Sequence, residues 1–249
     1  MLPHASLVVL SFNRQKYLQA SLESLWATPA GSSYELIICD DGSDEATQAY
    51  IFELVKAKKV SAALFNVHHN MGIGIAVNRG FQIARGSFLF KLDADLEYKS
   101  GWLREALWLL EANYRIGCLG LFKYWHEPCH FDKRLIQTLS ASVGGETHGY
   151  HEVEDFVGSA VCMRREVYEK FGPWREVAPG EVGHFSEDIV FKKAVQAGGF
   201  CMALPLDDLV TNVGFGEQHS SLIKVIDWSG KGQHQYNWPD PRPLVFEGG

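Results

Sequence analysis

Asp93 and Asp95, separated by one alanine, form the pair whose residue types and spacing point most directly to chemistry. Two carboxylates this close repel each other unless a cation or hydrogen-bond donors neutralise them. A hard divalent ion, Mg²⁺ or Mn²⁺, shared with substrate phosphates is the usual solution. An isolated Asp-x-Asp is equally compatible with a polar turn after a strand, so the rest of the chain must decide between the two.

Two further acidic pairs stand at the ends of predicted elements, one after a strand and one at the start of a helix. Asp40 and Asp41 follow an apolar run, and Gly42 after them permits a tight turn. Glu187 and Asp188 stand at the start of a predicted helix, where acids complement the helix dipole. A capped helix start is therefore the alternative to a catalytic role for this last pair.

The elements that must position the first two pairs alternate between strands and helices. Apolar runs predict buried strands at 5–12, 34–39, 60–67 and 87–92, and helical spacing predicts helices at 15–26, 45–56 and 75–84. This alternation is typical of a parallel sheet with right-handed crossovers. Ligands bind at the carboxyl ends of strands in such sheets, so the acids are aimed at one site.

The second half of the chain is less regular. Its pattern predicts strands at 118–125, 155–163 and 200–204, helices at 101–114, 164–171 and 186–197, and a polar segment at 126–151 able to hold a hairpin. We find no repeat and no low-complexity linker. The sequence therefore predicts one domain, with a nucleotide-binding half at 1–98, a second half at 99–215 and a tail at 216–249 that packs over the site.

Composition excludes several classes of protein. A chain of 249 residues, 46% hydrophobic and 21% charged, is typical of a soluble globular domain. The net charge of −7 argues against a surface that coats nucleic acid, and no apolar run predicts a signal peptide or a membrane span. Five scattered cysteines favour a reducing cytoplasm, with peripheral association with the inner face of a membrane left open.

Five motifs occur in a fixed order between residues 5 and 205. They are Leu7–Asn13 with its Ser-Phe-Asn ending, Asp40-Asp41-Gly42-Ser43-x-x-x-Thr47, the segment Asn70–Gly86 with spaced Asn, Ala and Gly residues, Leu92-Asp93-Ala94-Asp95, and Glu187-Asp188. Together they resemble the motifs of inverting family 2 glycosyltransferases of the A-type glycosyltransferase fold. The resemblance implies an α/β fold, a single Rossmann-like domain with a mixed, mainly parallel central sheet and helices on both faces.

The resemblance also implies an activity and a donor site. The expected enzyme is metal-dependent and moves a sugar from a nucleoside-diphosphate sugar, with a UDP-sugar favoured, to a hydroxyl of a carbohydrate or glycoconjugate acceptor. Asp41 resembles the carboxylate that accepts a hydrogen bond from the nucleobase, and Arg79 is expected near the diphosphate. The full set of expected donor-binding residues is Ser11, Asn13, Asp40, Asp41, Asn78, Arg79 and Asp93. Turn and cap chemistry is an equal alternative for Asn13 and Asn78.

The same resemblance assigns the metal and the base. Asp95 resembles the direct ligand of Mn²⁺ or Mg²⁺, with Asp93 beside it near the ribose and His219 as a further ligand. Asp188 resembles the general base that takes the proton of the acceptor hydroxyl, and Glu187 is expected to position the acceptor.

Other functions remain open from the sequence. A sugar-nucleotide nucleotidyltransferase shares a related sheet, but the segment at 11–15 after the first strand lacks the glycines of a loop that grips a triphosphate. A non-catalytic glycan-binding protein would not be expected to carry Asp41, Asp95 and Asp188 together. Gly72-x-Gly74 follows the wrong strand for a dinucleotide site. His126, Cys129 and His130 lack four-ligand zinc spacing. The tryptophans could form a sugar-stacking platform or simply pack in the core, and they are Trp125, Trp174, Trp228 and Trp238.

Overall fold

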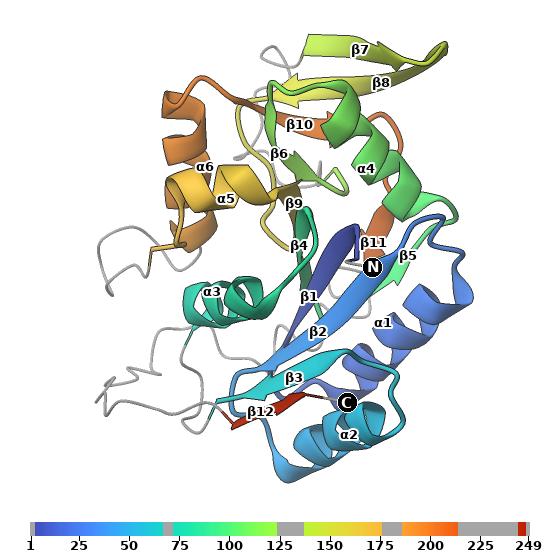
Figure 1. Ribbon diagram of the computed structural model, residues 1–249, viewed down its shortest axis with the longest axis vertical. Coiled ribbons are helices and arrows are strands. Elements are labelled where there is room, and N and C mark those ends of the chain that lie inside the picture. The colour runs from blue at the N-terminus through green and yellow to red at the C-terminus, as the bar shows by residue number, and fades with distance from the viewer. Residues whose placement is uncertain (1–2, 67–71, 124–136, 176–185, 214–243, 248–249) are drawn as a thin grey trace.

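The computed structural model describes residues 3–66, 72–123, 137–175, 186–213 and 244–247 (Figure 1). Its strands are β1 (Ala5–Ser11), β2 (Tyr34–Asp40), β3 (Ala62–Phe65), β4 (Phe88–Asp93), β5 (Leu96–Tyr98), β6 (Ile116–Gly120), β7 (Gln137–Val143), β8 (Glu146–Val153), β9 (Ala160–Arg164), β10 (Cys201–Pro205), β11 (Val210–Asn212) and β12 (Leu244–Glu247). Its helices are α1 (Gln15–Ala27), α2 (Glu45–Lys56), α3 (Ile73–Ile83), α4 (Trp102–Ala112), α5 (Arg165–Phe171) and α6 (Ser186–Ala197).

Ten strands form one mixed sheet in the order β12-β3-β2-β1-β4-β9-β6-β10-β8-β7. The run β3-β2-β1-β4 is parallel, and β9 joins it to the second half by antiparallel pairing with β4 and β6. The chain moves outward from β1 through β2 to β3 and then places β4 on the other side of β1. In open α/β sheets, ligands bind beyond the carboxyl ends of the strands at such a switch point. Ser11, Asp40 and Asp93 end the three strands that meet there.

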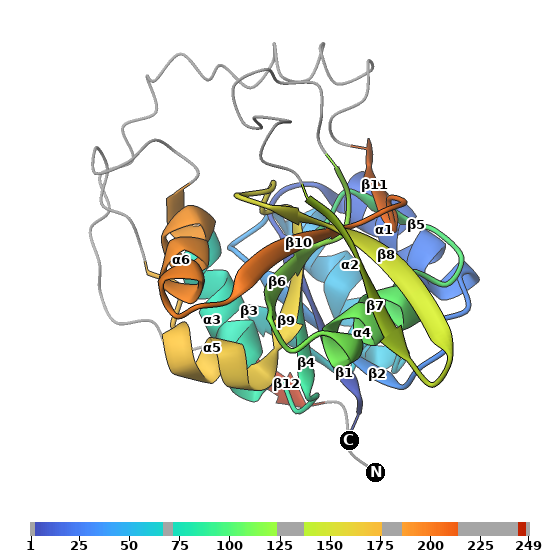
Figure 2. The ribbon, with the colours of Figure 1, turned by 90° about the horizontal axis from the view of Figure 1, so that it is seen from above.

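Helices cover both faces of the sheet, which confirms the predicted α/β architecture (Figures 1 and 2). Side chains alternate between faces along a strand, so Leu7 and Val9 of β1 pack with α1, α2 and α4, whereas Val8 packs with α3, α5 and α6. Trp102 is fully buried in the first core and Trp174 in the second. Trp174 thus packs in the core and does not form a sugar-stacking platform.

Two residues of the parallel half, Asp44 and Gly80, show how residue type shapes the helices there. The side chain of Asp44 accepts a hydrogen bond from Thr47 N at 2.8 Å and caps α2 where the acidic loop ends. Helix α3 lies close to the sheet at Gly80, where an added Cβ would overlap Val8 and lie 2.9 Å from Cys39 Sγ. Only glycine permits that approach.

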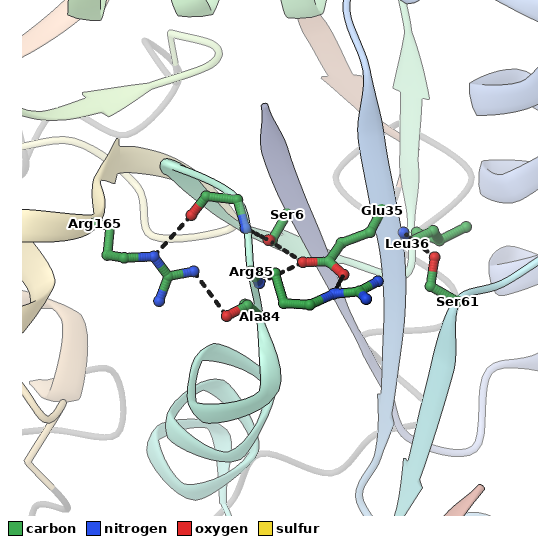
Figure 3. A network of polar contacts seen from close by, with 8 residues as sticks. Ser6, Glu35, Leu36, Ser61, Ala84, Arg85 and Arg165 are labelled. Carbon is green, nitrogen blue, oxygen red and sulfur yellow. Dashed lines mark hydrogen bonds and ion pairs between the residues drawn. The ribbon is translucent and has the colours of Figure 1, made fainter. Parts of the chain in front are cut away.

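A polar network ties the amino ends of the parallel strands together (Figure 3). Glu35 accepts hydrogen bonds from Ser6 Oγ at 2.6 Å and Arg85 Nε at 2.9 Å, and Ser6 Oγ in turn accepts from Gly86 N at 2.8 Å. Arg165 donates to the carbonyl oxygen of Gly86 at 2.8 Å. This network joins β1, β2, α3 and α5 at the edge opposite the carboxyl ends of the parallel strands, so it supports the fold and not the site.

The second half departs from the predicted strands in two places. Strand β6 ends at Gly120 and does not continue to residue 125, and β9 begins at Ala160 and not at residue 155. Residues 155–159 form a loop instead, because Phe156 is drawn into the core and the carbonyl group of Gly158 bonds to a lysine on β4. The predicted hairpin is present as β7 and β8, and it turns at Gly144 and Gly145, both at positive φ.

The end of the chain is described only at Leu244–Glu247. These residues form β12, which pairs antiparallel with β3 at one edge of the sheet. In the described segments, none of the helices combines the length and the apolar character needed to cross a bilayer.

Candidate functional site

The predicted pair of acids lies where β4 ends at the switch point. Asp93 is the last residue of β4, and its amide donates to the carbonyl oxygen of Ser159 at 2.9 Å. Asp95 lies in the tight turn between β4 and β5 and is only 4% exposed. The turn therefore buries one carboxylate and leaves the other at the surface, where 30% of the Asp93 side chain is exposed.

Two of the described side chains hold the Asp95 carboxylate. Arg14 Nη1 lies 2.8 Å from its Oδ2, and Asn212 Nδ2 donates to its Oδ1 at 3.2 Å. Burial raises the pKa of Asp95 above its ordinary value of 3.8, and the charge of Asp93 raises it further, while Arg14 and Lys91 lower it. The net shift is upward because burial and the Asp93 charge outweigh Arg14 and Lys91, so a cation bound beside Asp95 would stabilise its ionised form.

Asp93 has a counter-cation of its own within the same strand. Lys91 Nζ lies 2.5 Å from Asp93 Oδ1 and donates to the carbonyl oxygen of Gly158 at 2.8 Å. The Lys91 side chain is buried, so the ammonium group is held inside the protein between these two partners. Lys91 thereby links β4 to the loop at 155–159.

The oxygen atoms around Asp95 fit a hard divalent cation. Asp93 and Asp95 supply carboxylates, and the buried Asn212 Oδ1 has no hydrogen-bond partner in the part of the chain that the structure describes. Leaving a buried amide oxygen unpaired is unfavourable, and Mg²⁺ and Mn²⁺ prefer such oxygen ligands. No group of three or more His, Cys, Asp and Glu side chains gathers within the described ranges, and His219 lies outside them.

Asp40 organises the loop that follows β2. Its carboxylate accepts hydrogen bonds from Ser43 N at 3.0 Å, from the Ser43 hydroxyl and from Gln48 Nε2 at 3.4 Å. Burial raises the pKa of Asp40, although the hydrogen bonds from Ser43 lower it. Gly42 adopts φ 79°, the tight turn predicted for it. Asp40 therefore holds the shape of the loop that presents Asp41.

Ser11 and Asn13, at the end of β1, lie against this loop. The carbonyl oxygen of Ser11 accepts from Asp41 N at 2.9 Å, while the buried Ser11 hydroxyl has no hydrogen-bond partner among the described residues. Asn13 has φ 52°, its amide donates to Ser43 Oγ at 2.9 Å, and its Oδ1 accepts from Asp44 N at 2.7 Å. Asn13 braces the two loops, and Ser11 offers an unused hydroxyl between them.

Asp41 leads to a buried chain of polar groups. Its Oδ1 accepts from Asn66 Nδ2 at 2.6 Å and its Oδ2 from Gly72 N at 2.9 Å. Asn66 Oδ1 accepts in turn from Arg79 Nη1. Asn66 thus connects two of the predicted donor-binding residues, Asp41 and Arg79, at the carboxyl end of β3.

Asn78 is not brought to this group. Its Nδ2 donates to the carbonyl oxygen of Trp174 at 2.8 Å, and its Oδ1 accepts from Trp174 N at 2.9 Å and Tyr168 Oη at 3.0 Å. These contacts engage both ends of the amide in fastening α3 to the segment after α5.

The predicted base lies in the first turn of α6. Asp188 is buried, and Lys192 Nζ, one turn along the helix, lies 2.9 Å from its Oδ2. The carboxylate packs directly on Gly158, where an added Cβ would overlap Asp188 Oδ2. The carbonyl oxygen of Gly158 also accepts a hydrogen bond from Lys91, the lysine paired with Asp93. Gly158 therefore lies between Asp188 and the ion pair of Lys91 with Asp93. The backbone of Glu187 belongs to α6, and its side chain lies outside what the structure describes.

Five polar residues of the site were not singled out from the sequence. Two are lysines with a local signal: a lysine in an apolar strand needs a partner, and Lys192 stands four residues from Asp188 on one helix. The others are Arg14, Asn66 and Asn212, whose partners are distant in the chain, so no local pattern marks them. Two groups of residues considered from the sequence lie outside the described residues. They are the possible zinc ligands His126, Cys129 and His130, and the possible stacking residues Trp125, Trp228 and Trp238. The cysteines that the structure describes, Cys39, Cys118, Cys162 and Cys201, are buried and free.

Known proteins share this fold and parts of this sequence. The mannosyltransferase PcManGT from Pyrobaculum calidifontis, in complex with GDP-Man and Mn²⁺, superposes with a TM-score of 0.65 at 17% identity over 90% of this chain and 61% of its own. The GalNAc(5)-diNAcBac-PP-undecaprenol beta-1,3-glucosyltransferase of Campylobacter jejuni is 30% identical over 102 residues, 41% of this chain and 33% of its own. The dolichol-phosphate mannosyltransferase of Pyrococcus furiosus is 23% identical over 167 residues, 66% of this chain and 47% of its own.

The chain spans between 20% and 58% of the length of curated relatives that it matches. The profile of one family, described as Glycosyl transferase family 2, matches residues 6–172. That match covers more than half of the chain and contains the switch point with Asp40, Asp41, Asp93 and Asp95. The chain belongs to glycosyl transferase family 2.

Proposed function

We propose that this protein is a metal-dependent, inverting glycosyltransferase that moves a sugar from a nucleoside-diphosphate sugar to an acceptor hydroxyl. The observation that carries the proposal is the buried Asp95 at the switch point, with Asp93 two residues before it and Asn212 bonded to it. Asn212 Nδ2 donates to Asp95 Oδ1, and Asn212 Oδ1 has no hydrogen-bond partner among the described residues. A family 2 chain with this arrangement has carboxylate and amide oxygens of the kind that bind a hard divalent ion, and that ion would in turn bind the oxygens of a diphosphate.

The donor nucleoside is proposed to bind between the ends of β1 and β2, within the half at residues 1–98. Asp41 Oδ1 accepts from Asn66 Nδ2 and its Oδ2 from Gly72 N, which fixes the carboxylate at this edge, and a carboxylate is the acceptor that reading a base N–H group requires. The buried Ser11 hydroxyl has no hydrogen-bond partner among the described residues, and the nucleoside would supply one. Arg79, already bonded to Asn66, would bring positive charge toward the diphosphate. Asn13 and Asp40 hold the loops, and Asn78 acts at a distance by fixing α3.

Asp93, Asp95 and Asn212 are the residues proposed to hold Mn²⁺ or Mg²⁺, together with His219. When bound, such an ion neutralises the charge of the diphosphate and of the leaving nucleoside diphosphate. The burial of Asp95 serves this role, because a carboxylate held in a low-dielectric site attracts a cation more strongly than one in water.

Asp188 is proposed as the general base. It accepts the proton of the acceptor hydroxyl while that oxygen forms a bond to the anomeric carbon, and the bond from that carbon to the diphosphate oxygen breaks on the opposite face. The electron pair leaves with the nucleoside diphosphate, and the anomeric configuration is inverted. Lys192 supports this role by fixing the carboxylate through Oδ2, and the side chain of Glu187 would help to place the acceptor.

The acceptor is proposed to be a carbohydrate or a glycoconjugate, bound by residues 99–215 with the tail at 216–249 over the site. The names of two relatives mention lipid phosphates, an undecaprenol diphosphate glycan and a dolichol phosphate. A lipid-linked acceptor, reached by peripheral association with a membrane, therefore belongs among the acceptors to be tested.

The test is a panel of nucleotide sugars, beginning with UDP-sugars and GDP-mannose, assayed for release of nucleoside diphosphate with Mn²⁺ and a set of glycan and lipid-phosphate acceptors. The wild type should release the diphosphate, Asp95→Asn should lose donor binding, and Asp188→Asn should bind donor but not transfer. Glu97→Gln, which changes an exposed acid on β5, is the matched control and should behave as wild type. Release of pyrophosphate from a nucleoside triphosphate would indicate a nucleotidyltransferase and refute the proposal, as would absence of donor binding.

A further inference from the structure

Among the described residues, Arg14 is the one cationic side chain in an ion pair with the buried Asp95. Its Nη1 lies 2.8 Å from Asp95 Oδ2, while Asn212 occupies Oδ1. The Asp95 side chain is 6% exposed and that of Arg14 is 41% exposed. One partner of this ion pair is thus fixed inside the protein, and the other reaches in from the surface.

A divalent ion and the Arg14 guanidinium would compete for the same oxygen. Oδ2 is the oxygen of Asp95 on which the guanidinium lies, and two cations on a single buried carboxylate repel each other. Asp95 cannot move away readily, because it is held by Asn212 and because Val213 N donates to its carbonyl oxygen at 2.9 Å. The long, partly exposed side chain of Arg14 is the component that is able to move.

The diphosphate of the donor is the partner that Arg14 would gain. Arg14 directly follows Asn13, so it stands beside the loops proposed to hold the nucleoside, and it lies at the start of α1 next to the ends of β1 and β4. A guanidinium group matches the geometry of phosphate oxygens and binds them through paired hydrogen bonds.

We propose that Arg14 is an exchangeable counter-cation: it neutralises Asp95 when no metal is bound, and it transfers to the diphosphate of the donor when a divalent ion takes its place. The inference rests on the proposed function. It makes the binding of metal and nucleotide mutually supportive, because the metal must displace Arg14 and the nucleotide gives the displaced Arg14 a partner. Coupling of this kind between two ligands is typically about 5- to 150-fold in affinity.

The experiment measures binding and not turnover. Binding of Mn²⁺ alone is followed by the electron paramagnetic resonance signal of the free ion, and binding of uridine diphosphate is followed by calorimetry with and without Mn²⁺. In Arg14→Met, Mn²⁺ alone should bind at least about fivefold more tightly than in the wild type, whereas uridine diphosphate in the presence of Mn²⁺ should bind more weakly, so that the coupling shrinks. These two effects have opposite signs, and a merely structural role for Arg14 would not produce them.

Two variants complete the design. Lys16→Met removes an exposed cation two residues away on α1 and should leave both affinities at the wild-type values. Arg14→Lys keeps a charge and should retain most of the coupling, and it also serves if Arg14→Met proves unstable. If the wild type binds Mn²⁺ and uridine diphosphate but Arg14→Met binds Mn²⁺ no more tightly, the inference alone is overturned. If the wild type binds neither, the proposed function fails and the inference fails with it.

Discussion

Replacement of Lys192 by methionine tests whether the proposed base depends on a buried counter-cation. Lys192 Nζ lies 2.9 Å from Asp188 Oδ2, and it also contacts the Asp155 carboxylate and the carbonyl oxygen of Phe156. The side chains of Lys192 and Asp188 are 3% and 11% exposed, so water cannot replace the lost ammonium group at Asp188. Methionine keeps most of the volume of lysine and removes its charge.

The expected magnitude follows from that burial. Removing one partner of a buried ion pair costs about 3 to 5 kcal/mol, because the other charge remains buried without compensation. The lower end applies here, since Asp155 is 40% exposed and regains water. We therefore expect Lys192→Met to lower the free energy of unfolding by about 3 kcal/mol, which is roughly a hundredfold in the folding equilibrium.

Equilibrium unfolding in urea, followed by circular dichroism, measures this change. The matched control is Lys193→Met, which removes an exposed lysine from the same turn and should change stability by less than about 0.5 kcal/mol. The double variant Asp188→Asn with Lys192→Met should be more stable than Lys192→Met alone, because Asp188 no longer carries a buried charge without its counter-cation. If Lys192→Met and Lys193→Met unfold alike, the buried ion pair does not support Asp188 and the reasoning is refuted.

Three further predictions use other parts of the molecule. Burial raises the pKa of Glu35, but hydrogen bonds from Ser6 and Arg85 and the Arg85 charge outweigh it, so the pKa lies below the ordinary value of 4.5. The ionised Glu35 carboxylate therefore stabilises the fold above pH 4.5, and this stabilisation is lost as the pH falls through the folded-state pKa. Glu35→Gln should therefore be about 1 to 2 kcal/mol less stable than wild type at pH 7 and approach wild-type stability in acid, as pH-dependent urea unfolding will show; an equal deficit at every pH would contradict the assignment. Gly80→Ala should lower the thermal midpoint, because the new methyl group meets the sheet beneath α3 and overpacking costs about 1 to 3 kcal/mol, more than the gain in helix propensity; a raised midpoint would count against this. Gly158→Ala should slow sugar transfer at least about tenfold with donor affinity unchanged, because the new Cβ displaces the Asp188 carboxylate. Steady-state kinetics at saturating donor will measure this, and full activity of the variant would show that the contact between Gly158 and Asp188 does not matter for transfer.

Much of the fold follows from local pattern, and the parallel half most clearly. Strand runs and helical spacing located β1 to β4 and α1 to α3, because each of these elements carries its own local apolar pattern. The sequence pattern predicts a strand at 155–159, but these residues form a loop. Phe156 is apolar because it packs in the core, and not because it belongs to a strand. Period-two reasoning does not distinguish these two demands over five residues.

The acids of the site were visible from the sequence, but their partners were not. Asp93 and Asp95 are marked by their spacing and by the strand before them. Asn212 reaches Asp95 only because β11 pairs with β5 in a separate two-stranded sheet, a contact between residues more than one hundred positions apart. A pairing of that range leaves no trace in local composition, so the environment of the carboxylates required the structure.

The most direct test of the account is a crystal of the protein grown with MnCl₂ and uridine diphosphate, measured at the manganese absorption edge. The account predicts an anomalous peak bonded to a carboxylate oxygen of Asp95 and to the diphosphate, with Arg14 no longer on Asp95 Oδ2. A bound diphosphate with no manganese at Asp95, or manganese bound elsewhere while Arg14 keeps its 2.8 Å contact, would contradict it.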